Sequence, residues 1–221
     1  MQHVRRPVAL VASLAFTLLA SSSASAALPE FLGTFPTKYT GSLGLTKFET
    51  RGKLTATCKS SQVTGEITGA KAGTFEFVFK ECATPFGNCH TFGQANGTMH
   101  IPGTIELAYI TKPDVGFIFR PKTLPTPVKM ECIETGGVIL ELLLRGGIIT
   151  LISKTNTKTS SFELIIKQAS GVQEYTEYKE GETTRVAFLE EWTPEKEMFQ
   201  QEAIESAKAT LATEKELEVM A

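Results

Sequence analysis

Much of the sequence after residue 27 consists of short stretches in which apolar and polar residues alternate. The segments 74–79 (TFEFVF), 104–110 (TIELAYI) and 161–168 (SFELIIKQ) are examples. A period of two is typical of strands, and Gly, Pro or Asn separates these stretches at intervals of about 8 to 12 residues. The sequence therefore predicts an all-β, mainly antiparallel fold: a β-sandwich or a jelly-roll or barrel-like domain.

The first 26 residues have the pattern of a signal peptide. Arg5 and Arg6 precede a short apolar stretch over 8–20, and small residues lead to Ala24-Ser25-Ala26. This order predicts cleavage between Ala26 and Ala27. The apolar stretch is shorter than the roughly 20 residues that a membrane helix needs, which disfavours an uncut anchor. We expect a secreted or cell-surface protein with no membrane span in the mature chain, and residues 27–221 as a single mainly-β domain.

The charge balance argues against nucleic acid as a partner. The chain has 22 Lys and Arg against 24 Asp and Glu; without Arg5 and Arg6 the balance is 20 against 24, a net charge of −4. Proteins that bind nucleic acid or anionic lipid through charge carry a basic patch, and no basic cluster occurs in this sequence.

The cysteines are Cys58, Cys82, Cys89 and Cys132. An even number in an exported chain predicts disulfides, although four cysteines allow three pairings. The spacing does not contain the C-x-x-C repeat of zinc or redox sites. Cys82 and Cys89 flank the turn-forming segment 83–88 (ATPFGN), so we expect a Cys82–Cys89 bridge, which leaves Cys58 to pair with Cys132.

The apolar run over 138–152 is predicted to form a hairpin with a two-residue turn at Gly146-Gly147. Arg145 would then lie opposite Ile148, and Glu141 would lie on the more polar face, where it reaches solvent or a basic neighbour. A carboxylate with a raised pKa in a pocket is the alternative for Glu141. The apolar face of this hairpin would consist of Val138, Leu140, Leu142, Leu144, Ile149 and Leu151.

The C-terminal segment 192–221 is ambiguous. Thr193 and Pro194 resemble a helix start, and apolar residues recur every four positions from Phe199 to Leu211, so local propensity favours a helix. Apolar residues also alternate at 207, 209 and 211, which is the pattern of a strand.

Several segments resemble a group of small exported bacterial proteins of unknown function. They include 57–69 (TCKSSQVTGEITG), 156–168 (NTKTSSFELIIKQ) and the closing 216–221 (ELEVMA). The resemblance implies an extended chain for the last few residues and leaves room for a short helix before them. It implies no functional residue.

Residue types that carry catalysis are scarce. Asp114 is the single aspartate, His90 and His100 are the histidines after residue 26, and no G-x-S-x-G motif occurs. We therefore predict no catalytic residue, no cofactor and no metal site, and we expect His90 to be a loop residue. The favoured hypothesis is a non-catalytic surface or extracellular module that binds a glycan or another cell-envelope component through loops such as 83–97.

A secreted glutamate-dependent glycan hydrolase is the alternative, because glycoside hydrolysis requires only two carboxylates across a cleft. The sequence distinguishes no such pair among its glutamates. Trp192 could stack on a sugar, but we expect it to close a sheet edge.

Overall fold

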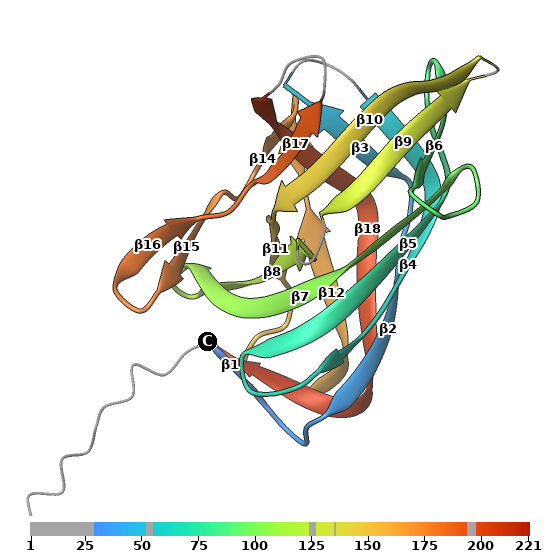
Figure 1. Cartoon of the computed structure of the whole chain (residues 1–221). Helices are drawn as coiled ribbons and strands as arrows, with labels where there is room; N and C mark the ends of the chain where they lie inside the picture. The colour runs from blue at the N-terminus through green and yellow to red at the C-terminus, as the bar shows by residue number, and fades with distance from the viewer. Residues whose placement is uncertain (1–28, 52–54, 124–126, 135, 194–197) are drawn as a thin grey trace, which may run out of the picture.

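The computed structural model describes residues 29–51, 55–123, 127–134, 136–193 and 198–221 (Figure 1). The predicted cleavage site at Ala26 and Ala27 lies outside these residues. No described residue is helical, so the predicted all-β fold is confirmed. The strands are β1 (Glu30–Leu32), β2 (Thr37–Leu43), β3 (Thr46–Thr50), β4 (Thr55–Ile67), β5 (Ala72–Thr84), β6 (Gly87–Thr91), β7 (Thr98–Thr111), β8 (Asp114–Pro121), β9 (Val128–Glu134), β10 (Gly137–Gly146), β11 (Ile148–Ile152), β12 (Thr159–Ile166), β13 (Gln168–Ala169), β14 (Val172–Gln173), β15 (Glu177–Glu180), β16 (Thr183–Val186), β17 (Leu189–Thr193) and β18 (Met198–Met220).

The main sheet closes on itself twice, in a barrel-like arrangement, and its strand pairs are antiparallel. The first ring follows the pairings β2–β4–β5–β7–β8–β11–β12–β18 and returns from β18 to β2. The second ring follows β3–β4–β5–β6–β9–β10–β17–β18 and returns to β3. The long strands β4, β5 and β18 belong to both rings, and Figure 1 shows β18 bending along the length of the molecule.

One continuous core fills both rings. Phe75, Phe77 and Phe79 of β5 are 3%, 5% and 2% exposed, so the alternation read from the sequence places them inward as predicted. The Phe77 ring lies 5.3 Å from that of Phe119 in the first ring, and the Phe79 ring lies 5.1 Å from that of Phe48 in the second. Because β5 contributes to both rings, its aromatic side chains join their interiors.

Two glycines make room for core aromatic rings in neighbouring strands. Gly65 lies opposite Tyr39, and Gly103 lies opposite Phe75. A Cβ atom on Gly65 would lie 2.5 Å from the Tyr39 hydroxyl, and one on Gly103 would lie 2.5 Å from the Phe75 ring. Placing an aromatic ring over a glycine on the adjacent strand fills the space that the missing side chain leaves. The Tyr39 hydroxyl also donates a hydrogen bond to the carbonyl of Thr74 at 2.9 Å.

The end of the chain is a strand, in agreement with the extended conformation expected for the last residues. The helix favoured by local propensity is wrong for 198–213, because β18 continues through this stretch. Strands β12 and β17 pair with one side of β18, and β2 and β3 pair with the other. Ala209, Leu211, Leu217 and Val219 are buried. Pairing on both sides satisfies the backbone groups that a helix would have paired internally, so the tertiary structure overrides propensity.

The predicted hairpin over 138–152 is also wrong. Strand β10 pairs with β9 and β17 in the second ring, whereas β11 pairs with β8 and β12 in the first. The chain crosses between the rings at Gly146-Gly147, where Gly146 has a φ of 84°. A positive φ suits glycine, so the Gly146-Gly147 pair does mark a turn of the chain. This turn leads from one ring to the other and does not join two paired strands.

The predicted faces hold for Leu142 and Leu144 of β10, but they fail at Val138, which is 54% exposed, and in β11. Leu142 and Leu144 are buried, whereas Glu141 is only half-buried. In β11, Ile148 and Thr150 are buried on the side assigned to the polar face. Ile149, on the opposite side, packs in a second small cluster with Ala108, Ile118, Tyr178 and Ala187. The alternation could not separate the two sides because both sides of β11 are covered.

Replacing Thr150 by valine is expected to stabilise the fold by about 1 kcal/mol. Thr150 is 0% exposed, and its Oγ1 atom has no hydrogen-bond partner among the described residues. Valine keeps the shape and removes a buried polar atom that is costly to leave unpaired. Urea unfolding of the two proteins measures the difference, with Thr40→Val on the exposed face of β2 as the control. A lower midpoint for Thr150→Val would contradict this account.

Thr150→Lys should be severely destabilising, not mild as the predicted faces imply.

Among the described residues, no helix is long and apolar enough to cross a membrane.

Candidate functional site

The disulfides join neighbouring strands. Cys58 lies opposite Cys82 in the β4–β5 pair, and Cys89 lies opposite Cys132 in the β6–β9 pair. The bridges are Cys58–Cys82 and Cys89–Cys132, so the predicted Cys58–Cys132 and Cys82–Cys89 bridges are wrong. The turn between Cys82 and Cys89 was correctly recognised, since β5 and β6 pair next to it. Cys82 and Cys89 each have another strand beside them as well. The disulfide partner of Cys82 lies on β4, and that of Cys89 lies on β9.

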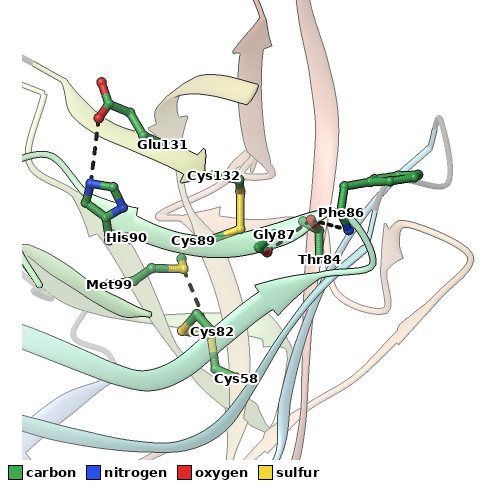
Figure 2. The surroundings of a disulfide bond; sticks show 10 residues. All are labelled: Cys58, Cys82, Thr84, Phe86, Gly87, Cys89, His90, Met99, Glu131 and Cys132. Carbon is green, nitrogen blue, oxygen red and sulfur yellow. Dashed lines mark hydrogen bonds and ion pairs between the residues drawn. A yellow bond between two sulfur atoms is a disulfide. The ribbon is translucent and has the colours of Figure 1, made fainter. Parts of the chain in front are cut away.

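Figure 2 shows the Met99 side chain pointing between the two bridges. Its Sδ atom is 4.0 Å from Sγ of Cys58, and Met99 is fully buried. On the chain-entropy model, closing loops of 24 and 43 residues contributes about 3.5 and about 4 kcal/mol respectively. No cysteine is free, so in this state the cysteines offer neither a nucleophilic thiolate nor a metal ligand. The sulfur cluster is therefore structural.

Charged residues form a row on the outer face of β6, β9 and β10. His90, predicted to be a loop residue, lies in β6 with its Nε2 atom 3.6 Å from Oε2 of Glu131 (Figure 2). Lys129 Nζ lies 3.0 Å from Glu131 and 3.1 Å from Glu141. Hydrogen bonds to Glu131 and to Glu141 raise the pKa of Lys129. Glu141 thus has the basic neighbour that was expected.

Two carboxyl groups, not singled out from the sequence, face the interior. Glu191 and Glu202 are 2% and 4% exposed. In the β17–β18 register, Glu191 lies opposite Gln200 and Leu189 opposite Glu202, so the two carboxyls are diagonal neighbours. Burial, and after it the charge of Glu191, raise the pKa of Glu202 well above its usual value. Alternation from the buried Leu189 would have placed Glu191 inward.

These carboxyls line a small cavity with Cys89, Cys132 and Met99. Its volume is ≈ 10 Å³, about the space of one water. No cationic side chain is among its described lining residues. A sugar cannot enter a space of this size, so the geometry does not suit the two carboxylates for glycoside hydrolysis.

The outer face of β7 carries an open depression that we call the Lys122 groove. It consists of two hollows of ≈ 600 and ≈ 630 Å³ that share Pro102 and Lys122. Its lining residues from β5, 74–76, lie where β5 pairs with β7, and its other end reaches β6, β9 and β10. Side chains at one end include Phe92, Gln94, Lys129 and Leu143, and at the other Thr64, Thr74, Thr104 and Arg120.

The groove contains threonine hydroxyls and one exposed aromatic ring. Thr64, Thr74, Thr104 and Thr123 are exposed, whereas Thr91 is buried and its hydroxyl accepts a hydrogen bond from the His100 N–H at 2.8 Å. Each threonine hydroxyl can donate and accept a hydrogen bond. Phe92 is 70% exposed, and the Lys129 ammonium lies 5.2 Å from its ring centroid. The groove therefore offers a stacking surface at one end and many hydrogen-bonding groups along its length.

Polar contacts fix the basic side chains of the groove. His100 Nε2 lies 2.5 Å from Oε1 of Glu76. Arg120 donates to the Tyr178 hydroxyl at 2.8 Å and to Glu106 at 3.4 Å. Their partners hold these groups in defined positions on the outer face of the sheet.

Trp192 lies beside the Phe92 end of the groove. On the outer face of the second ring, Lys129 lies opposite Leu143, and Leu143 lies opposite Trp192. Trp192 is half-buried in β17, a strand that pairs with β10 and with β18. The prediction that it closes a sheet edge is wrong, because β17 has a neighbour on each side. The predicted binding loop 83–97 contributes Thr91, Phe92 and Gln94 to the groove.

No cluster of three or more His, Cys, Asp or Glu side chains that could hold a metal occurs among the described residues. Comparison with protein-family models, with curated proteins and with solved structures found no match to the chain.

Proposed function

We propose that the chain is an exported binding module whose Lys122 groove holds a glycan of the cell envelope or its surroundings. The observation that carries the proposal is the long, open groove with its four exposed threonine side chains and the exposed Phe92 ring. Sugars present hydroxyl groups at their edges and C–H groups on their faces, and these two kinds of group match hydroxyls and an aromatic ring. The signal-peptide pattern and the two disulfides support export.

The dimensions of the groove favour a polymer. His100, Pro102 and Thr104 follow one another on the outer face of β7, which makes the central part alone about 13 Å long. Strand β7 pairs with β5 over residues 98–106 and with β8 from Gly103 onward. Over Gly103 and Thr104 both edges of β7 are therefore occupied, and an extended peptide cannot add there as a further strand. At that end of the groove, recognition has to proceed through side chains on the sheet face.

The lining favours binding over hydrolysis. A glycoside hydrolase places two carboxyl groups on either side of the scissile bond. Glu76 is the single carboxylate among the described lining residues, and it is held by His100. Turnover of a glycan by the mature protein, abolished by Glu76→Gln while binding persists, would favour the hydrolase instead.

Phe92→Ala is expected to weaken glycan binding about tenfold, because it removes the stacking surface. The measurement is titration of mature protein, residues 27–221, with the glycans and cell-wall fractions that it retains in a binding screen. Phe86→Ala is the matched control: Phe86 is 63% exposed on the β5–β6 turn and does not line the groove. Equal affinities of the two variants for a bound glycan would exclude the Lys122 groove as the site.

A further inference from the structure

We infer that the Lys122 groove selects a glycan that carries carboxylate groups at intervals, in preference to a neutral glycan or a densely charged polyanion. This inference rests on the proposed function and names the ligand class of the same site. It follows from which charges face the groove and from which charges lie behind it.

The described lining of the groove reverses the charge balance of the chain. Three cationic side chains, those of Arg120, Lys122 and Lys129, line it against one acidic side chain, that of Glu76; His100 is a fourth basic group, charged only when protonated. The whole chain has 24 acidic residues against 22 Lys and Arg. A surface on which basic groups gather in an acidic protein favours an anionic ligand at that place.

Three of the basic groups are held by acidic partners. Glu76 binds His100, Glu106 binds Arg120, and Lys129 has Glu131 and Glu141. The Arg120 guanidinium also lies 5.4 Å from the ring centroid of Tyr178. Side chains that are already fixed lose little conformational entropy when a ligand binds, so these groups suit directed hydrogen bonds.

Lys122 differs from the other three. It has no acidic partner among the described residues, it is exposed, and it lines both hollows at their junction. Its ammonium group is thus the uncompensated charge at the centre of the groove. A carboxylate of the ligand would supply the missing partner through a charge-assisted hydrogen bond.

The acidic partners of these basic groups also limit how much negative charge a ligand of the groove can carry. Glu76, Glu106, Glu131 and Glu141 stand close to the basic groups and offset most of their field. Nucleic acids and densely sulfated polymers require a surplus of positive charge along their whole contact. A polymer with a single carboxylate on a sugar ring that keeps its other hydroxyls matches Lys122 and the threonines together.

The test compares polygalacturonate oligomers with their carboxyl-reduced form, which has the same backbone and a hydroxymethyl group in place of each carboxylate. We expect mature protein to bind the carboxylate form about tenfold more tightly at moderate salt. Lys122→Gln should abolish this preference, so that the variant binds the carboxylate form and the reduced form equally tightly. Lys71→Gln is the control, since Lys71 is exposed and lines neither hollow.

Each other outcome is informative. Equal binding of the two polymers, or a preference that survives Lys122→Gln, overturns the inference and leaves the proposed function standing. Tighter binding of heparin or of poly-glutamate than of polygalacturonate overturns it as well, because these are a dense polyanion and an acidic peptide. Failure to bind the test polymers or any glycan in the screen overturns the proposed function and the inference with it.

Discussion

Gly103→Val is expected to prevent stable folding, with a loss of more than about 4 kcal/mol in the free energy of unfolding. A Cβ atom at this position would lie 2.5 Å from the Phe75 ring and would also collide with the carbonyl oxygen of Arg120. Neither the Phe75 ring nor the Arg120 carbonyl can move aside without a large cost in free energy. The Phe75 ring packs edge-on against Phe119 at 5.2 Å, and residue 120 lies in the ladder between β7 and β8.

Far-UV circular dichroism and urea unfolding of purified Gly103→Val protein measure this effect. Gly69→Val is the control, because no atom lies within 4 Å of a Cβ atom at position 69. That variant should fold with a midpoint close to that of the parent protein. A cooperative unfolding transition for Gly103→Val at the parent's midpoint would show that β5 and β7 pack less closely than described.

Glu202→Gln is expected to stabilise the protein at alkaline pH by about 1–3 kcal/mol and to change little near pH 4. Glu202 is buried beside Glu191 in a cavity lined by sulfur atoms and apolar groups. Thr50 and Thr84 are the other polar residues in the described lining. Two carboxyls in such a space resist simultaneous ionisation, so ionisation of Glu202 is opposed in the folded protein.

The sign of the pH dependence follows from the raised pKa of Glu202. In the unfolded chain the carboxyl ionises with a pKa of about 4.3. Below that value Glu202 is protonated in both states, and its contribution to stability is fully present. As pH rises toward the higher pKa of the folded state, the unfolded chain releases the proton more readily, and stability is lost. Glutamine cannot ionise and removes this loss.

Urea midpoints of the parent protein and Glu202→Gln between pH 4 and pH 9 test this prediction. The difference between the two should grow with pH. Glu205→Gln, at an exposed position of the same strand, should give a curve parallel to the parent. Parallel curves for Glu202→Gln as well would show that the carboxyl pair is not buried as described.

The local conformation of the chain could largely be predicted from its sequence, whereas strand pairing could not. The alternation at 74–79 and the turn within 83–88 are both found where the sequence places them. These features depend on residues within a few positions of one another. The failed hairpin at Gly146 and the failed disulfide pairing both concern which strand lies beside which, and that depends on contacts between distant segments.

The candidate site also depends on contacts between distant segments, which the sequence does not indicate. The Lys122 groove combines Thr64, Phe92, Pro102, Arg120 and Lys129, which come from different parts of the chain and share no motif. Loop 83–97 contributes Thr91, Phe92 and Gln94 to the groove, but nothing in its sequence indicates that Phe92 faces Lys129. Asp114 and Trp192, two residues noticed for their rarity, line neither hollow.

The sharing of β4, β5 and β18 has a consequence for how the protein comes to be folded. Each ring is closed by a different stretch of β18, whose 23 residues are the last strand in the sequence. During synthesis, or during any passage through a membrane that starts from the N-terminus, neither ring can close until its own stretch of β18 has emerged, 198–206 for the second ring and 206–217 for the first. Earlier strands would meanwhile expose unpaired edges, which are prone to aggregation. Deletion of β18 should therefore unfold both rings together, because the two rings form one cooperative unit and neither is stable alone.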